Sequence, residues 1–181
     1  MSHIQAVTWL DTRAFAESLP GHIKEFDEIT LRQDAPGSPH KDTRAIFLRG
    51  PSASTPEAAV RAWFDDVAYT DYGNLLQWPE ALDLVDDILL QLPSAAVGKI
   101  MLVELKAGGA LAWHIDEGDY AKAYRRFHLP IVTNPMAFMY TGGDQAHLPV
   151  GVLTEFDTSV LHSAINAGPA PRIHLILDVR R

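Results

Sequence analysis

Before Pro93 the apolar residues recur mainly at helical spacing. The segment WPEALDLVDDILLQLP, residues 78–93, predicts a helix with a broad apolar stripe of Leu82, Leu84, Val85, Ile88, Leu89 and Leu92. The segment STPEAAVRAWFDDVA, residues 54–68, also predicts a helix, because a Ser/Thr cap, a first-turn proline and an acid precede its apolar positions. We expect these two helices to pack on one face of a sheet. Nearer the N-terminus, TRAFAESL (12–19) is a short amphipathic segment and RAIFLRG (44–50) is strand-like.

After Pro93 the pattern changes to short β-type runs separated by glycine, proline and asparagine. The runs are GKIMLVELKAGG, LAWHID, RFHLPIVTN, AFMYTGG, PVGVLTEFD, VLHSAINAG and RIHLILDV. Six or seven short strands at a spacing of roughly ten residues are typical of a small sandwich or barrel. We therefore expect one domain over residues 1–181. In it, residues 1–95 supply helices and a strand that pack on a barrel formed by residues 96–181, which also carry the chemistry.

Composition narrows the classes of partner and ligand. The chain has 181 residues, of which 47% are apolar, which is enough for one globular domain. Its formal net charge of -8 argues against binding to nucleic acid or to an anionic membrane, so small molecules or proteins are the expected partners. With no cysteine in the chain, disulfides and thiolate sites are excluded, and His, Asp and Glu are left as metal ligands. No run of 18 apolar residues and no signal-like start occur, so we expect a cytoplasmic protein.

A candidate metal site begins in the segment AWHIDEGDY, residues 112–120. Strand side chains alternate between faces, so His114 and Asp116 point the same way and can present two ligands to one ion. Such a pair can equally be a hydrogen-bonded strand histidine followed by a turn. His162, in VLHSAIN, offers a third ligand, although a single histidine there also fits a semi-buried core position. Two histidines and one carboxylate form the facial triad that suits non-haem Fe(II) and leave three positions open.

Two later strands each place an arginine and a histidine on one face. Arg172 shares its face with His174, Ile176 and Asp178, and an arginine inside a barrel requires an anion. The carboxylate of a bound dicarboxylic acid would pair with Arg172, but a protein carboxylate or exposure at the start of the strand would also satisfy it. Arg126 and His128 share a face of RRFHLPIV, with Arg125 on the other side.

These segments resemble the aspartyl/asparaginyl β-hydroxylase family. The matching pieces are HID (114–116), RFHLP (126–130), HSAIN (162–166) and RIHLILDV (172–179), in the family's order. The resemblance implies a mostly β fold with flanking helices, the double-stranded β-helix or cupin-like jelly roll. It also implies an enzyme that uses Fe(II), 2-oxoglutarate and O2. In that case His114, Asp116 and His162 would form the catalytic iron site, Arg172 would pair with the distal carboxylate of 2-oxoglutarate, and Arg126 and His128 would line the cosubstrate pocket.

Asp116 refines the resemblance. The family's animal members lack the carboxylate ligand, so this chain looks more like the bacterial members, including free-proline hydroxylases. Halogenating relatives in the wider superfamily have a small residue at that position, so Asp116 also argues against halogenation. The implied reaction is hydroxylation of an unactivated C–H bond in an amino acid or in an aspartyl, asparaginyl or prolyl residue, with release of succinate and CO2. For substrate binding we name His40 and Arg44, in PHKDTRAIF, with Arg44 as a partner for an amino acid carboxylate. Both also fit a solvated loop.

Three other hypotheses about the function stay open at this point. A zinc enzyme can use the same two histidines and aspartate, but zinc would not explain the arginine ten residues beyond the last ligand. A non-catalytic cupin that binds a small molecule is the second. A nucleic-acid demethylase is the third, and the acidic charge disfavours it. The substrate and the oligomeric state stay open as well.

Overall fold

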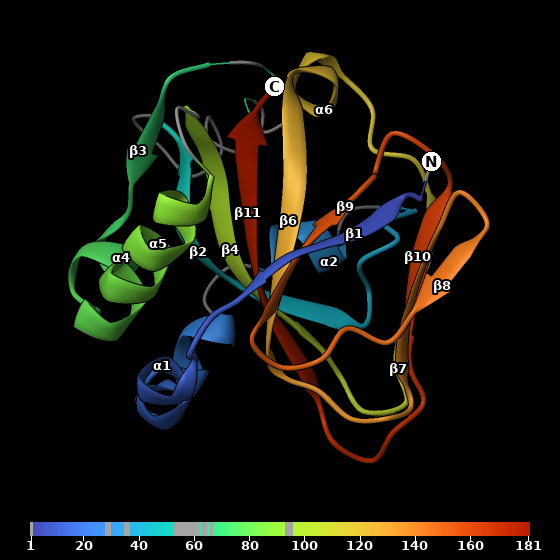
Figure 1. The fold of residues 1–181 in the computed structure, drawn as a ribbon, viewed down its shortest axis with the longest axis horizontal. Helices are drawn as coiled ribbons and strands as arrows, with labels where there is room; N and C mark the ends of the chain where they lie inside the picture. The colour runs from blue at the N-terminus through green and yellow to red at the C-terminus, as the bar shows by residue number, and fades with distance from the viewer. Residues whose placement is uncertain are drawn as a thin grey trace.

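The fold consists of two antiparallel β-sheets with helices on one side (Figure 1). A computed structural model describes residues 2–27, 30–34, 37–52, 62, 65, 67–92 and 96–181. The large sheet has seven strands in the order β1 (Ile4–Trp9), β9 (Val152–Phe156), β6 (Tyr124–Val132), β11 (Arg172–Arg180), β4 (Val97–Leu105), β2 (Thr43–Pro51) and β3 (Tyr69–Asp71). The small sheet has four, in the order β5 (Ala110–His114), β10 (His162–Asn166), β7 (Ala137–Thr141) and β8 (Asp144–Ala146).

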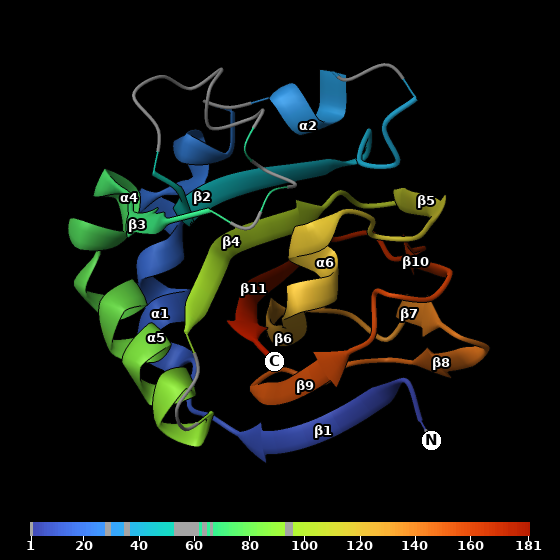
Figure 2. The same cartoon turned by 90° about the horizontal axis from the view of Figure 1, so that it is seen from above.

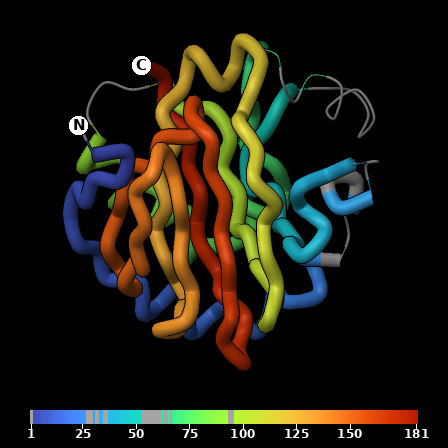
Figure 3. Tube along the Cα trace, turned by 90° about the vertical axis from the view of Figure 1, so that its right-hand side faces the viewer, coloured from blue at the N-terminus to red at the C-terminus, as the bar shows by residue number. Residues whose placement is uncertain are grey.

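The chain passes back and forth between the two sheets from β4 onward. Strands β4, β6, β9 and β11 belong to the large sheet, and β5, β7, β8 and β10 belong to the small one. Figure 3 looks onto the small sheet, where β10, late in the chain, lies between the earlier strands β5 and β7. This alternation is the double-stranded β-helix, so the predicted fold class is confirmed. The sequence pattern did not reveal β1 or β8.

Helices from the first half of the chain cover the outer face of the large sheet, whereas the short helix before β6 lies over one end of the space between the sheets (Figure 2). The described helices are α1 (Arg13–Ser18), α2 (Leu31–Asp34), α4 (Gly73–Leu76), α5 (Pro79–Gln91) and α6 (Asp119–Ala123), with short 3-10 turns at Leu19–Gly21 and Ile23–Asp27. The predicted stripe on α5 is confirmed, because its buried residues belong to the same apolar cluster as Leu102 and Leu175 of the large sheet. The helix predicted over 54–68 falls largely outside the described residues. No described helix is long and apolar enough to cross a membrane.

The inner face of the large sheet looks into the space between the sheets, and polar side chains gather there. On β4 the side chains alternate, with Leu102 in the cluster under the helices and Met101 and Val103 lining the interior. The interior also receives His128 from β6 and Arg172 from β11, both buried. Residues 1–95 contribute β1, β2 and β3 to the large sheet. The predicted role of that half as a layer around a barrel formed by 96–181 stays a prediction.

Truncating α5 on its buried side should destabilise the protein, and truncating it on its exposed side should not. Ile88 is fully buried, whereas the Leu90 side chain is 78% exposed. We expect Ile88→Ala to lower the free energy of unfolding by about 3 kcal/mol, because it removes buried methyl groups and leaves a cavity. We expect Leu90→Ala, in the same helix, to change it by less than about 0.5 kcal/mol. Urea unfolding followed by circular dichroism measures both, and equal losses would contradict the packing of α5 on the sheet.

Candidate metal centre and cosubstrate pocket

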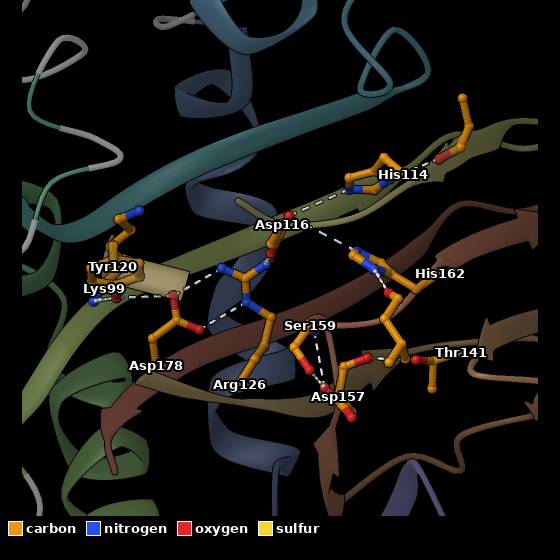
Figure 4. Close-up of polar contacts among 12 residues, drawn as sticks. Lys99, His114, Asp116, Tyr120, Arg126, Thr141, Asp157, Ser159, His162 and Asp178 are labelled. Atoms are coloured by element: carbon orange, nitrogen blue, oxygen red, sulfur yellow. Dashed lines mark hydrogen bonds and ion pairs between the residues drawn. The ribbon is translucent and has the colours of Figure 1, made fainter. Parts of the chain in front are cut away.

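Three side chains with metal-binding atoms meet at one end of the barrel interior (Figure 4). Strand β5 ends at His114, Asp116 follows two residues later, and His162 opens β10. The register of β5 with β10 sets His162 directly opposite His114. Asp116 Oδ1 lies 3.5 Å from His114 Nε2 and 3.9 Å from His162 Nε2, and the three ligand atoms lie within 4.8 Å of one another. The structure thus brings together the three predicted ligands.

Each histidine ring is held by a hydrogen bond to the backbone two residues earlier. His114 Nδ1 lies 2.8 Å from the Ala112 carbonyl oxygen, and His162 Nδ1 lies 3.0 Å from the Val160 carbonyl oxygen. Because a carbonyl oxygen only accepts, Nδ1 of each ring is the donor, and in the neutral form of the ring Nε2 carries the lone pair on the side of Asp116. Metal-binding histidines are oriented in this way in proteins. Burial, the largest effect, lowers the pKa of His162, which favours the neutral ring that a metal requires.

Asp116 is fixed from two directions. Its backbone N–H donates to the Thr158 carbonyl oxygen at 3.1 Å, which ties the end of β5 to the segment before β10. Its Oδ2 accepts a hydrogen bond from Arg126 Nη1 at 2.6 Å. Burial alone would raise the pKa of Asp116, but the Arg126 charge, the largest opposing effect, holds it well below its usual range. The carboxylate is therefore ionised, with Oδ1 facing the two histidine nitrogens.

Behind Asp116 a buried polar network continues into the large sheet. Arg126 donates from Nε and Nη2 to the two oxygens of Asp178, at 2.8 and 2.9 Å. Asp178 Oδ2 also accepts the Tyr120 hydroxyl at 3.0 Å, and that hydroxyl accepts the Lys99 backbone N–H at 2.8 Å. Burial, followed by the Asp178 charge, raises the pKa of Tyr120 and keeps the phenol protonated. No role for Tyr120 or Asp178 followed from the sequence, although strand alternation does put Asp178 on the Arg172 face.

Arg172 is a buried cation without a counterion among the described residues. Its side chain opens β11 and is only 4% exposed. No carboxylate in the described part of the chain forms an ion pair with it, and its buried Nε and Nη1 atoms have no hydrogen-bond partner there. Burial lowers its pKa to about 10, so it stays charged near neutral pH. Since an unpaired buried guanidinium is costly, this position is suited to an anionic ligand.

Two buried histidines lie beside Arg172. His128 and His174 approach each other through their Nδ1 atoms at 3.3 Å. Burial, the largest effect, and then the Arg172 charge lower the pKa of both rings well below the usual value, so both are neutral. His174 Nε2 is buried without a hydrogen-bond partner among the described residues. The pair therefore adds no positive charge around Arg172.

One pocket joins two of the three candidate metal ligands, His114 and His162, to Arg172. Its walls include most of the side chains singled out from the sequence, namely His40, His114, Arg126, His128, His162 and Arg172. Apolar side chains complete the lining, among them Met101, Val103 and Leu105 of β4 and Ile176 of β11. The His40 ring lies 5.4 Å from the His114 ring, centroid to centroid, and so reaches the metal end of the pocket.

The structure does not bring Arg44 to this pocket. On β2 the side chains alternate, so Thr43 lines the pocket while Arg44 points to the opposite face of the sheet. There its guanidinium pairs with Glu104 at 2.8 Å and lies 5.5 Å from the centre of the Phe26 ring. The suggestion that Arg44 contacts a substrate carboxylate therefore has no support from its position.

Comparison with known proteins bears on the family and the fold of the chain. The family model described as aspartyl/asparaginyl beta-hydroxylase matches residues 63–181. No curated protein matches the sequence. Among solved structures, HygX from Streptomyces hygroscopicus with nickel and 2-oxoglutarate bound has a TM-score of 0.54 at 11% identity, over 99% of this chain and 83% of that one. Its complex that also holds hygromycin B has a TM-score of 0.53 at 11% identity, over the same shares of the two chains.

A third solved structure extends the likeness in fold. The nickel complex of ThoJ, a non-heme monooxygenase, has a TM-score of 0.50 at 19% identity, over 97% of this chain and 71% of that one. At such identities these structures share the fold and define nothing finer. The family model, by contrast, covers about two thirds of the sequence, including all three candidate ligands and Arg172. The chain belongs to the aspartyl/asparaginyl β-hydroxylase family.

Proposed function

We propose that this protein is an Fe(II)- and 2-oxoglutarate-dependent oxygenase that hydroxylates an unactivated C–H bond. Its substrate would be an amino acid, or an aspartyl, asparaginyl or prolyl residue in a peptide. One observation carries the proposal: a buried arginine without a counterion among the described residues, Arg172, shares a pocket with two of the three grouped ligands. A metal site alone would not require that arginine, whereas a metal-binding dicarboxylate would.

The donor set fits Fe(II). Two neutral imidazoles and one carboxylate, without sulfur, are the ligands of the facial triad in non-haem iron oxygenases. His114 and His162 would hold the ion through Nε2, and Asp116 through Oδ1. Bound iron, together with 2-oxoglutarate and O2, supplies the oxidising chemistry that places one oxygen atom on the substrate carbon and releases succinate and CO2.

The other pocket residues would bind and orient. Arg172 would pair with the distal carboxylate of 2-oxoglutarate in the interior, where no described carboxylate competes for it. His128, also in the lining, would bound the same space as a neutral ring. The apolar side chains of β4 and Ile176 would keep water from the reacting groups. His40 would contact the substrate at the metal end, and no side chain need act as a general base.

Removing either histidine should abolish metal binding and leave the fold intact. We expect His114→Ala and His162→Ala to weaken Fe(II) or Ni(II) binding by more than about 100-fold, because changes to groups that merely orient ligands already cost about 10–100-fold. Anaerobic titration calorimetry measures the affinity, and circular dichroism measures the fold. His147→Ala is the control, since its ring donates to the Ala137 carbonyl away from the three ligands. Collapse of the fold in either ligand variant would indicate a core role for that histidine.

Arg172→Leu should separate cosubstrate binding from metal binding. Losing the partner of a buried ionic contact costs about 3 kcal/mol, so we expect affinity for 2-oxoglutarate to fall by about 100-fold with metal affinity unchanged. Without ligands the variant should be at least as stable as the parent, because an unpaired buried charge has been removed. Arg125→Leu is the matched control, since Arg125 is half-exposed and pairs with Glu155 at 3.1 Å. Unchanged cosubstrate affinity in Arg172→Leu would show that the arginine serves another anion.

Turnover identifies the reaction and the substrate class. We expect one member of a panel of free amino acids and aspartyl-, asparaginyl- or prolyl-containing peptides to stimulate succinate release from 2-oxoglutarate. Mass spectrometry should then show a gain of one oxygen atom in that compound. The reaction should require Fe(II) and O2 and should stop when a chelator removes the metal. An activity supported by zinc without 2-oxoglutarate would refute the proposal.

A further inference from the structure

The second oxygen of the Asp116 carboxylate is already occupied. Oδ1 faces the Nε2 atoms of His114 and His162, whereas Oδ2 accepts the 2.6 Å hydrogen bond from Arg126 Nη1. A carboxylate can offer one or both oxygens to a metal. Here the guanidinium holds Oδ2, and only Oδ1 is left to face the two histidines.

Arg126 is itself held rigidly. Its Nε and Nη2 atoms donate to the two oxygens of Asp178, a paired contact that fixes the plane and direction of the guanidinium. Asp178 is 1% exposed, so it cannot exchange this contact for water. All three guanidinium nitrogens thus donate to carboxylates of the chain. Although Arg126 lines the pocket, its charge is directed at Asp116 and Asp178, unlike that of Arg172.

Tyr120 anchors the far end of this network. It lies on α6, is 3% exposed, and joins Asp178 Oδ2 to the backbone N–H of Lys99 on β4. Its ring stacks on Tyr124 with a centroid distance of 4.2 Å. Gly98 leaves room for the phenol, because a side chain at that position would collide with the Tyr120 hydroxyl. The hydroxyl therefore has one fixed position, and so does the Asp178 oxygen to which it donates.

The charges of the Tyr120–Asp178–Arg126–Asp116 network favour a cation beside Asp116 Oδ1, the oxygen that faces the histidines. Asp116 and Asp178 contribute two negative charges and Arg126 one positive charge, which leaves an excess of one negative charge. The only Asp116 oxygen not taken up by Arg126 is the one facing the histidines. A divalent cation there would offset the excess, and the bonds from Tyr120 to Arg126 would keep Asp116 from turning toward it.

We propose that Tyr120 and Asp178 are positioning residues that, acting through Arg126, hold Asp116 so that it presents a single oxygen to the metal. The inference rests on the proposed metal role of Asp116, and it assigns Arg126 to ligand orientation in addition to lining the pocket. It also explains why Asp178 lies near the end of the buried strand β11 and why Tyr120 is buried on the short helix α6. These groups orient the carboxylate, as the backbone carbonyls of Ala112 and Val160 orient the two histidines.

Tyr120→Phe tests this positioning. The substitution removes the hydroxyl and keeps the stacked ring, so Asp178 and Arg126 gain freedom and Asp116 Oδ2 can reach the metal. We expect Co(II) affinity, measured by calorimetry without cosubstrate, to fall by about 10–100-fold. The visible spectrum of the Co(II) protein should change, because a second carboxylate oxygen would take one of the positions that the three ligands leave open. The affinity of the Co(II)-loaded protein for 2-oxoglutarate should change much less than in Arg172→Leu.

Tyr124→Phe is the matched control. It makes the same change in the ring stacked on Tyr120, but the Tyr124 hydroxyl lies 3.4 Å from Arg180 Nη1 and forms no hydrogen bond to Asp178. Its Co(II) affinity and spectrum should equal those of the parent. Asp178→Asn should give the same Co(II) spectrum as Tyr120→Phe and a larger loss of Co(II) affinity. If Tyr120→Phe does not fold, Asp178→Asn tests the positioning role in its place.

The outcomes separate this inference from the proposed function. Parent protein that binds Co(II), with unchanged affinity and spectrum in both Tyr120→Phe and Asp178→Asn, would overturn the positioning role alone. Equal losses in Tyr120→Phe and Tyr124→Phe would also overturn it, because they would reflect packing of the ring stack. Parent protein that binds no divalent metal would overturn both proposals.

Discussion

A charge buried inside a protein is costly unless a partner compensates it, and this constraint organises the interior of the barrel. Asp116, Arg126 and Asp178 compensate one another through short hydrogen bonds. Arg172, on the same strand as Asp178, has no such partner among the described residues. Both neighbouring histidines have pKa values lowered far enough to be neutral, so they neither compensate Arg172 nor add to its charge. Asp116 and Asp178 are therefore both paired with an arginine, whereas Arg172 has no counterion in the described part of the chain.

The double-stranded β-helix keeps the polar interior separate from the apolar cluster that stabilises the large sheet. The central strands of the large sheet, such as β4 and β11, are buried on both faces, with helices packed outside and the pocket inside. The outer apolar cluster stabilises the sheet without involving the pocket, so polar groups inside need only satisfy one another or a ligand. The pairing of β5 with β10 then sets the two histidines of the candidate metal site opposite each other at the point where both strands meet the loops. Ligands held on paired strands are positioned more firmly than ligands on a loop.

Strand periodicity in the sequence predicted which side chains of a strand share a face. It did not predict features that depend on contacts between residues distant in the sequence. His114 and Asp116 share a face because of local alternation, whereas the grouping of His162 with them rested on the resemblance to the hydroxylase family. Alternation could not say which face of β2 looks inward, because that depends on where the helices pack, and Arg44 proved to point outward to Glu104. Strand β1 is largely exposed and β8 has three residues, so neither has a strong apolar pattern. The contact of Tyr120 with Asp178 joins residues 58 positions apart, and no local pattern encodes it.

The two pocket arginines differ through their neighbours and not through their chemistry. Both lie on adjacent strands of the large sheet and line the same pocket, and the side chain is buried in Arg172 and largely buried in Arg126. In Arg126 every nitrogen donates to an aspartate, and the flanking charges raise its pKa despite burial, which alone would lower it. In Arg172 burial acts without compensation and lowers the pKa. A ligand carboxylate that enters the pocket would gain more from Arg172, since Arg126 would have to give up a protein carboxylate to receive it. The aspartates thus determine which arginine is left to bind an anion, and the direction in which a dicarboxylate would lie follows from them.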